Sequence, residues 1–412
     1  PLPFLSVAIY KLSAAIHKRS TIVQQYLSKL TSFTQEGFSG ISVIKAYCIE
    51  PRIIKGFDVL SESSKDKNID LAKVQALFFP LMILLIGLSN ILVIYIGGKQ
   101  FINGEIEQLG TIVEFLIYVN MLTWPVAVIG WVTSMVQQAE ASQKRINEFL
   151  NEKPAIENYV EIETKINGVI EFKNLSFTYS DTNITALKNI SFKINPGETL
   201  AILGNTGSGK STILELIGRL YDVNNGQLKI NHKNIKDLNI SNLRGSIGYV
   251  PQDAFLFSDS ILNNIKFGKE NASNEEVFEA AKKASVHKNI IGFNKGYETI
   301  LGERGITLSG GQKQRVSIAR AIIKDPQILL LDDCLSAVDT ETEERILNNI
   351  DALLNDKTTI IVSHRISSAK NATKIIVLEE GKIIQQGTHN ELIKLKGYYK
   401  ELYAKQLLEK EN

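Results

Sequence analysis

The stretch "LAILGNTGSGKST", residues 200–212, decides the fold of the second half of the chain. Its apolar start predicts a buried strand, and the pattern GxxxxGK[ST] predicts a loop that wraps around phosphate groups before a helix begins. The glycines allow backbone N–H groups and the helix N-terminus to face the negative charge. We expect Lys210 to reach the β- and γ-phosphates and Ser211 to ligate magnesium. The residues expected to contact the nucleotide are Gly204, Asn205, Thr206, Gly207, Ser208, Gly209, Lys210, Ser211 and Thr212.

A second apolar run, "QILLLDD" at residues 327–333, ends in two carboxylates. A buried strand that ends in an acid delivers that acid to a metal–nucleotide site, so we expect Asp332 to hold magnesium through water. A lone aspartate at a strand end is otherwise a turn or cap residue. The phosphate-binding loop favours the metal interpretation, but it leaves open what the adjacent Asp333 does.

Between these two motifs lies "LSGGQKQR", residues 308–315. Ser309, Gly310 and Gly311 precede a predicted helix, whose N-terminus is a second anion-binding site. One ATP cannot use both helix ends of one chain if they point apart. We therefore expect a second copy of this domain to face the first.

Composition bounds the class of protein. The chain has 412 residues, which suggests at least two domains, and a formal net charge of +2, so no basic excess argues for nucleic acid. Its two cysteines, Cys48 and Cys334, show no zinc or disulfide spacing, and we expect both to be reduced. Because Pro1 stands inside an apolar run without a charged segment before it, we expect the chain to be part of a longer protein.

Two uncharged stretches, residues 77–97 and 115–136, are long enough to cross a bilayer as helices. Soluble core helices rarely stay uncharged over this length, so we favour membrane spans. Residues 11–76 hold ten Lys or Arg, whereas the loop 98–110 holds only Lys99. By the positive-inside rule, the long segment is then cytoplasmic and the short loop is outside.

The spacing of apolar residues in the rest of the sequence divides the chain into domains. Apolar residues at 3–4 spacing predict cytoplasmic helices over 13–76, with a break near 37–40. Together with the spans they form a helical domain over 1–150. Residues 151–167 are a polar linker, and 168–412 alternate short β-rich runs with helices, which is typical of an α/β domain.

In these motifs the chain resembles the ATP-binding cassette transporters, over essentially its whole length. The resemblance implies an all-α transmembrane domain, present in part, followed by an α/β P-loop NTPase domain of the cassette type with a helical subdomain. The first part resembles exporters with six spans per half; residues 1–12 would end the fourth span, and 77–97 and 115–136 would be the fifth and sixth. "QEGFSGISVIKAYCIEPR", residues 35–52, is similar to the second cytoplasmic loop of these exporters, whose coupling helix docks on the partner's ATPase domain.

The resemblance also implies roles for single residues. Taken alone, Tyr179 could be an edge-strand tyrosine and His364 a hydrogen-bonded residue at a strand end, but the shared order and spacing of the motifs disfavour this. The implied roles are adenine stacking for Tyr179, sensing of magnesium and γ-phosphate for Gln252, contact with the coupling helices for Glu303, closure on the partner's ATP for Ser309, Gly310, Gly311 and Gln312, dimer contact for Asp339, and the switch histidine for His364.

The resemblance gives Asp333 its interest. Related cassettes usually carry glutamate here, which polarises the attacking water, whereas aspartate withdraws the carboxylate by one methylene, ~1.5 Å. Misplacing a catalytic group by ~1 Å can cost ~10²-fold, so we expect tight ATP binding and slowed hydrolysis at this chain's own site. The motif LSGGQKQR at 308–315, which corresponds to the signature motif of the family, is intact. An altered catalytic position together with an intact signature motif resembles multidrug-type half transporters that pair with a different half. A homodimer that tolerates aspartate at this position is the alternative.

The expected function is therefore ATP-driven export of a hydrophobic or amphipathic substrate by one half of a dimer, with ATP sandwiched between two nucleotide-binding domains and Mg²⁺ as cofactor. The expected partners are a second half transporter, hetero- in preference to homodimeric, the lipid bilayer, and a small-molecule, lipid or peptide substrate. The expected location is the inner membrane, multi-pass, with a cytoplasmic ATPase domain. One alternative is a slowly hydrolysing or non-hydrolysing regulatory half. Another is a soluble ATPase that acts on DNA or ribosomes, against which the two spans argue.

Overall fold

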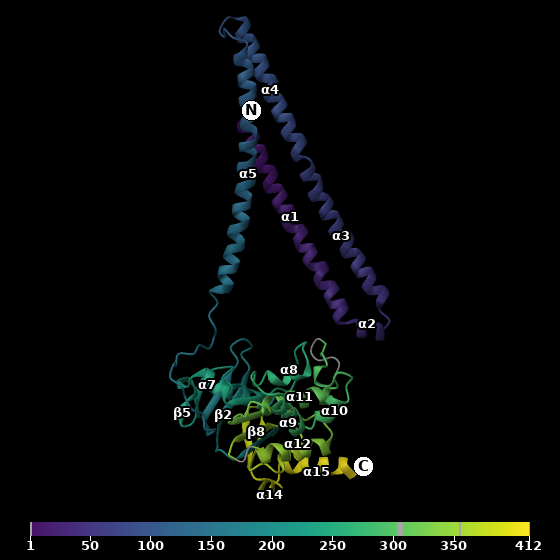
Figure 1. The fold of residues 1–412 in the computed structure, drawn as a ribbon, viewed down its shortest axis with the longest axis vertical. Helices are drawn as coiled ribbons and strands as arrows, with labels where there is room; N and C mark the ends of the chain where they lie inside the picture. Colours follow the sequence, from purple (N-terminus) through teal and green to yellow (C-terminus); the bar gives the residue numbers. More distant parts are fainter. Residues whose placement is uncertain (1, 303–307, 354–355, 412) are drawn as a thin grey trace. The chain divides into compact units, whose positions relative to one another are not determined.

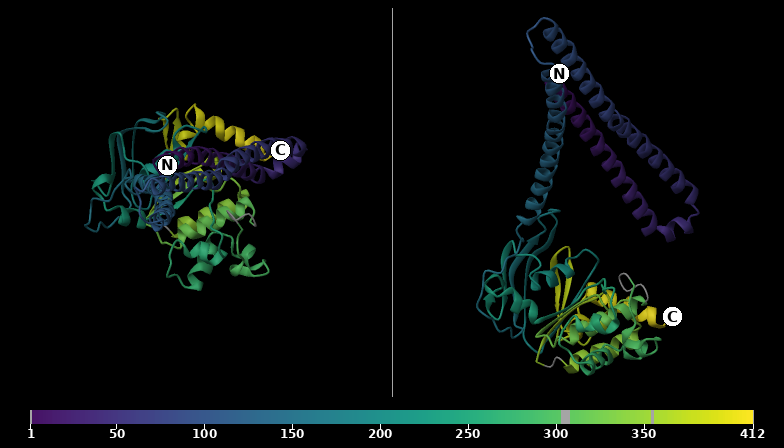
Figure 2. Two further views of the ribbon diagram at one scale, coloured as in Figure 1. Left: turned by 90° about the horizontal axis from the view of Figure 1, so that it is seen from above. Right: turned by 45° about the horizontal axis from the view of Figure 1, so that its top comes forward.

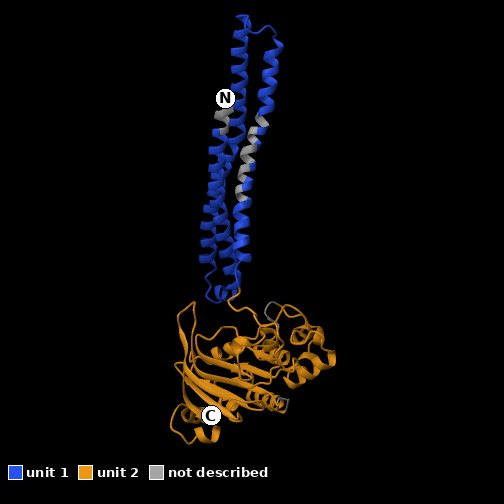
Figure 3. Cartoon of the chain, turned by 90° about the vertical axis from the view of Figure 1, so that its left-hand side faces the viewer, with its two compact units in different colours: residues 1–153 blue, residues 154–412 orange. Residues whose placement is uncertain are grey.

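The computed structural model describes residues 2–302, 308–353 and 356–411. It divides into two compact units, residues 1–153 and 154–412, shown in blue and orange in Figure 3. Each unit has its own internal packing and is described by itself below.

The first unit is entirely helical in its described residues. Its long helices α1 and α3 run side by side and are joined by the short α2 (Figures 1 and 2). Phe33 of α1 packs against Phe57 of α3, with ring centroids 6.4 Å apart. The helices are α1 (Leu2–Ser39), α2 (Ile41–Ala46), α3 (Glu50–Ala76), α4 (Phe78–Ile102) and α5 (Gly110–Leu150).

The turn between α1 and α3 confirms the break expected near residues 37–40, because α1 ends at Ser39. Helix α2 then occupies the tip, and Cys48 takes a φ of 53°, which reverses the chain into α3. An ion pair of 3.0 Å between Lys45 and Glu50 bridges the tip. Several large apolar side chains at this tip stay exposed: Phe38, Ile41, Val43 and Tyr47.

Within the described residues, one helical stretch, Glu50–Ile102, is long and apolar enough to cross a membrane, and Gly110–Leu122 is a shorter apolar helix. The expected span 77–97 lies in α4, and the expected span 115–136 lies in α5, where several side chains are outside the described set. Helices α4 and α5 approach closely at Gly97, where a Cβ would lie 3.1 Å from Ile112. Small residues at such crossings allow membrane helices to pack.

The second unit contains two β-sheets. An antiparallel sheet has the order β2-β1-β4-β5, and a six-stranded sheet has the order β10-β9-β3-β8-β7-β6. The strands are β1 (Ile170–Thr178), β2 (Thr185–Ile194), β3 (Thr199–Gly204), β4 (Asn225–Ile230), β5 (Lys233–Asn234), β6 (Ile247–Val250), β7 (Ile328–Asp332), β8 (Thr358–Val362), β9 (Lys374–Glu379) and β10 (Lys382–Gly387).

The central strands β9, β3, β8, β7 and β6 are parallel, and β10 joins the edge antiparallel to β9. Buried parallel strands are typically apolar along their whole length, which explains the continuous runs in β3, β7 and β8. Because the carboxyl ends of parallel strands meet at one edge, the loops after these strands meet there too.

Helices cover the six-stranded sheet (Figure 1), and the helices from α8 to α12 share one apolar cluster with residues of β6, β7 and β8. This is the expected α/β fold with a helical subdomain. The helices are α6 (Lys210–Ile217), α7 (Ile240–Gly245), α8 (Ile261–Lys266), α9 (Asn274–Lys283), α10 (His287–Ile291), α11 (Gly310–Ile322), α12 (Thr340–Leu353), α13 (Ile366–Ala369), α14 (His389–Leu392) and α15 (Tyr398–Glu411), with 3₁₀ turns η1 (Ile235–Asp237) and η2 (Gly296–Glu298).

The polar segment 151–167 differs from a free linker in its second half, which lies on the second unit. Asn239 donates from Nδ2 to the Val160 carbonyl at 2.6 Å, and the Thr164 N–H donates to Asn242 at 3.1 Å. Ile166 is buried in the core of this unit. The unit boundary at 153/154 reflects these contacts.

Candidate nucleotide site

The loop after β3 is shaped by two glycines that no other residue could replace without displacement. Gly204 has a φ of 147°, and a Cβ there would lie 2.2 Å from the Leu378 carbonyl oxygen. Gly209 has a φ of 98°, and a Cβ there would lie 2.4 Å from the Ala186 carbonyl oxygen. Both backbones therefore press against neighbouring strands, and this close approach requires glycine.

Lys210, the first residue of α6, is buried and bends back over this loop. Its Nζ donates to the carbonyl oxygens of Gly204 at 2.9 Å and Asn205 at 2.8 Å. Burial lowers the pKa of Lys210, and the carboxylates of Asp333 and Asp332 counter that change. A cation held by neutral carbonyls in a glycine-lined loop fits a phosphate group as its counterion.

Asp332, the last residue of β7, meets the phosphate-binding loop through Ser211. The Ser211 hydroxyl donates to Asp332 Oδ1 at 3.0 Å. Burial raises the pKa of Asp332; the Ser211 hydrogen bond lowers it, and the nearby Asp333 raises it further. A buried carboxylate, Asp332, beside a partly buried one, Asp333, fits a divalent cation, which would relieve their mutual repulsion.

The oxygen atoms of Ser211, Asp332 and Gln252 are the type of ligand that magnesium prefers. Ser211 and Asp332 offer hard oxygen ligands, and Gln252 lines the same cavity with an amide oxygen. The described residues hold no group of three or more His, Cys, Asp or Glu that could cage a metal alone. Magnesium is commonly bound through one or two carboxylates and takes its other ligands from substrate phosphates and water, so a site with few carboxylates is what this ion needs.

Asp333 and His364 follow neighbouring strands and lie at the same edge of the sheet. Asp332 pairs with Val362 in the β7–β8 register, so the next residues of both strands emerge together. The Asp333 N–H donates to the Val362 carbonyl at 2.9 Å, and Asp333 has a φ of 42°. Burial raises the pKa of Asp333, whereas His364, Lys210 and Arg365 lower it.

One cavity of about 350 Å³ gathers most of the residues expected from the sequence to bind nucleotide or act in catalysis. Residues that the sequence did not single out also line it, among them Lys188 and Glu380. The expected residues that line it are Tyr179, Thr206, Gly207, Gly209, Lys210, Ser211, Thr212, Gln252, Asp332, Asp333 and His364. Gly204, Asn205 and Ser208 belong to the same loop without lining the cavity, and the Ser208 hydroxyl is one of two buried side-chain polar atoms without a partner in the described residues.

Tyr179 stands at this cavity with its hydroxyl engaged. The hydroxyl donates to Glu215 at 2.7 Å and lies 2.9 Å from the Thr212 hydroxyl. Burial raises the pKa of Tyr179 to about 12; the Thr212 hydrogen bond lowers it and Glu215 raises it. The rings of Phe177 and Tyr221 meet the Tyr179 ring edge-on, which fixes its plane beside the phosphate-binding loop.

The signature residues lie elsewhere and do not line this cavity. Ser309 caps α11, its Oγ accepting from the Gln312 N–H at 3.3 Å, while Gln312 Oε1 accepts from the Ser309 N–H at 3.0 Å. This capping box uses the acceptors of both side chains, so it does not need their donors, the Ser309 hydroxyl and the Gln312 amide NH₂. Gly311 packs so closely that a Cβ would lie 2.7 Å from the Ala337 carbonyl oxygen.

Asp339 caps α12 by accepting from the Thr342 N–H at 2.9 Å, and this hydrogen bond holds the pKa of Asp339 below its usual range. Its carboxylate is exposed. Glu303, expected to contact the coupling helices, lies outside the described residues.

Arg365 is a functional candidate that the sequence interpretation missed. Its guanidinium donates to the Ser336 and Val338 carbonyls at 2.8 and 3.0 Å, and to the fully buried Glu343 at 2.9 Å. It therefore ties the segment that carries His364 to the loop after Asp333. The sequence interpretation gave Arg365 no role, because no spacing rule connects it to Ser336, Val338 or Glu343.

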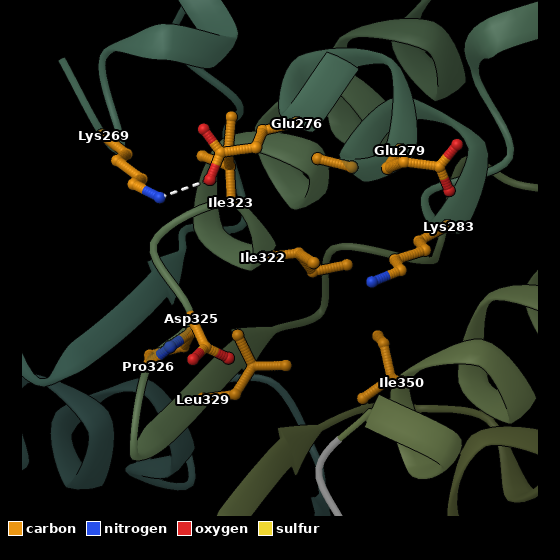
Figure 4. Close-up of a pocket in the computed structure, with 11 residues that line it drawn as sticks. Lys269, Glu276, Glu279, Lys283, Ile322, Ile323, Asp325, Pro326, Leu329 and Ile350 are labelled. Carbon is orange, nitrogen blue, oxygen red and sulfur yellow. Dashed lines mark hydrogen bonds and ion pairs between the residues drawn. The ribbon is translucent and has the colours of Figure 1, made fainter. Parts of the chain in front are cut away.

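A second hollow, of about 310 Å³, lies between α9, α11, β7 and α12 (Figure 4). Its floor is apolar, with Ile322, Leu329 and Ile350, and the Lys283 amine is directed toward Ile322. An ion pair between Lys269 and Glu276 closes one side. It lacks a glycine-rich loop, so its chemistry does not match that of a nucleotide site.

Two family models match this chain. Residues 187–336 match the model described as "ABC transporter", and residues 2–126 match the model described as "ABC transporter transmembrane region".

Relatives resemble the chain along nearly its whole length. It is 38% identical over 409 residues to "Multidrug resistance-like ATP-binding protein MdlA" of Escherichia coli (strain K12), which covers 99% of this chain and 69% of that protein. It is 39% identical over 404 residues to "Uncharacterized ABC transporter ATP-binding protein YknU" of Bacillus subtilis (strain 168), covering 98% and 69%.

A solved structure entitled "Structure of a bacterial Atm1-family ABC exporter with ATP bound" superposes with a TM-score of 0.85 and 29% identity. The match covers 97% of this chain and 71% of that one.

Proposed function

This chain belongs to the ATP-binding cassette (ABC) transporter family, and we propose that it serves as one half of a dimer that exports a hydrophobic or amphipathic compound. It is a membrane protein with a transmembrane region and a cytoplasmic ATPase domain, and ATP binding and hydrolysis drive export. The substrate, the identity of the second half and the roles of single residues are the proposed part.

One observation carries the proposal: in its described residues, the same chain holds a helical stretch long and apolar enough to cross a membrane and a cavity lined by a lysine, a hydroxyl and two carboxylates. The loop N–H groups and Lys210 bind the β- and γ-phosphates of ATP. Tyr179 stacks on adenine. Ser211, Asp332 and Gln252 hold Mg²⁺, which would neutralise phosphate charge.

Asp333 and His364 act on the bound phosphate. Asp333 orients and polarises the attacking water, and His364 contacts the γ-phosphate from the neighbouring loop. Both follow neighbouring strands in paired register, which brings the two segments to the same edge of the sheet.

The second half of the dimer completes each site. Because Ser309 and Gln312 do not line this chain's cavity and the capping box uses only their acceptors, their donors serve an ATP held by the partner. A hydroxyl and an amide NH₂ at a helix N-terminus are suited to a phosphate anion. Asp339 lies at the same face of the dimer and contacts the partner.

We propose a different half transporter as partner in preference to a second copy. The support is Asp333, whose short carboxylate weakens one site, while the signature that serves the other site is intact. The alternative is a regulatory half whose own site binds ATP tightly and hydrolyses it slowly or not at all. Single-turnover hydrolysis by the intact complex discriminates between the two: no hydrolysis at this site would favour the regulatory half.

The test is transport by the assembled transporter in proteoliposomes, with the amphipathic dye Hoechst 33342 as probe. ATP should drive dye movement, and Lys210→Ala should abolish the part that depends on this site, because the loop loses its cation. Dye movement that is independent of ATP in both proteins would contradict the proposal. A matched control is Lys229→Ala, since Lys229 lies on β4 outside the cavity.

A further inference from the structure

Helix α15 packs on the segment that follows His364 through the apolar cluster that contains Ile366 and Tyr399, and it hydrogen-bonds this segment through the side chain of Gln406. Gln406 Nε2 donates to the His364 carbonyl at 2.8 Å, and Gln406 Oε1 accepts from the Ile366 N–H at 2.8 Å. The amide therefore holds backbone groups on both sides of residue 365. Two bonds from one planar amide fix an orientation as well as a distance.

The opposite side of the same segment is held by Arg365, which donates to the carbonyls of Ser336 and Val338. Hydrogen bonds therefore connect the backbone around His364 to α15 on one side and to the loop after Asp333 on the other. In the described part of the chain, no hydrogen bond engages the His364 imidazole itself. The direction of the ring therefore depends on how its backbone is held.

Helix α15 does not depend on Gln406 for its docking. Tyr399 is fully buried in a cluster with Ala201 and Leu203 of β3, and its hydroxyl lies 2.6 Å from His389 Nδ1. At the same end of the helix, the Tyr398 hydroxyl donates to Asn205 of the phosphate-binding loop at 3.1 Å. The helix is therefore a fixed support that touches both loops of the nucleotide site from outside the cavity.

We propose that Gln406 is a positioning residue for ATP hydrolysis, which orients His364 by clamping its backbone to α15. The inference rests on the proposed function, in which His364 acts on bound ATP. Gln406 does not line the cavity, so its effect should fall on turnover rather than on ATP binding. A displacement of ~0.5 Å in the imidazole corresponds to roughly tenfold in rate, given ~10²-fold per ~1 Å.

The experiment compares Gln406→Leu, His364→Ala and Lys405→Ala in the whole transporter, purified with its natural partner and reconstituted in nanodiscs. Leucine keeps the size of the side chain and removes both hydrogen bonds. Lys405 is an exposed neighbour on the same helix. His364→Ala measures how much of the total turnover depends on this histidine. We expect Gln406→Leu to lower the part of kcat that depends on His364 by about tenfold. The KM for ATP should stay within about twofold of the parent value.

A second variant distinguishes misorientation of His364 from a general loss of stability. Gln406→Glu keeps an acceptor for the Ile366 N–H but sets an oxygen against the His364 carbonyl, so kcat should fall again while the melting temperature stays close to that of the parent. If His364→Ala lowers kcat and neither Gln406 variant does, the positioning inference is wrong and the proposed function stands. If His364→Ala leaves kcat unchanged, the role of His364 is wrong and the inference falls with it. A parallel rise in KM, shared by Lys405→Ala, would show general damage to α15 and would also overturn it.

Discussion

Asp333→Glu is the substitution that most directly tests how this site works. It extends the carboxylate by one methylene, ~1.5 Å, from a backbone that the Val362 hydrogen bond keeps in place. If reach limits catalysis, turnover at this site should rise by one to two orders of magnitude, because ~1 Å of misplacement costs ~10²-fold. That is about 1.4–3 kcal/mol off the barrier.

The same change should destabilise the fold slightly. Asp333 has a φ of 42°, a left-handed conformation in which aspartate is several-fold enriched and glutamate is not. The added strain should stay below about 1 kcal/mol, which lowers the melting temperature by no more than about 4 °C for a unit of this size. Activity and stability should therefore move in opposite directions, which a general stabilising effect cannot produce.

The assay measures steady-state ATP hydrolysis and retained nucleotide together, in the reconstituted transporter. In a homodimer both sites gain and turnover rises in full. In a heterodimer only this site gains, so total turnover rises modestly and trapped ATP disappears. Asp333→Asn, which keeps the size and removes the charge, should lower turnover further at this site. If Asp333→Glu changes neither quantity and Asp333→Ala leaves turnover intact, Asp333 does not activate the water.

Three further changes test other parts of the site. Lys210→Ala should abolish ATP binding at this chain's site, measured by titration with a fluorescent ATP analogue, because the loop loses its cationic side chain. Gly209→Ala should weaken that binding at least tenfold, since its Cβ would lie 2.4 Å from the Ala186 carbonyl oxygen and force the loop to move. Arg365→Ala should lower the free energy of unfolding by about 2–4 kcal/mol, because the fully buried Glu343 loses its cation.

Matched controls sharpen two of these. Gly207→Ala places a Cβ where no atom lies within 4 Å, at a φ of 80°, so it measures backbone strain without a clash. If Gly207→Ala weakens ATP binding as much as Gly209→Ala does, the clash with the Ala186 carbonyl does not explain the effect of Gly209→Ala. Arg345→Ala removes an exposed ion pair with Glu341 and should change stability by no more than about 0.5 kcal/mol. An equal loss from Arg365→Ala would contradict the importance of the buried pair.

The parts of the site predicted from sequence are those with local patterns. The phosphate-binding loop and Asp332 each combine an apolar run with a polar residue at a fixed offset, so the strand and its end could be recognised. That both strands lie in one parallel sheet then brings their ends together. The break before α2 was likewise visible, because helical spacing stops at two glycines.

The contacts that hold the site could not be predicted in this way. Gln406 and His364 are 42 residues apart, and their bond depends on how α15 packs against β3. Arg365 and Glu343 meet through the same kind of long-range packing. The capping box of Ser309 and Gln312 did have a local signal, the S-x-x-Q pattern, but which side-chain groups the cap uses and which it leaves needs the geometry of both side chains.

The strand order around β3 has a consequence for synthesis of the chain. In the sheet, Leu200 of β3 faces Ile360 of β8 on one side and Lys374 of β9 on the other, so both of its neighbours are made at least 160 residues later. At roughly 5–20 residues per second, the ribosome takes about 8–30 s to deliver them. During that interval an apolar strand carries two unpaired edges, the arrangement that invites aggregation. We therefore expect the yield of active protein to depend on whether the nascent chain avoids aggregation before β8 and β9 are made. The phosphate-binding loop, which follows β3, is among the last parts of its unit to fold.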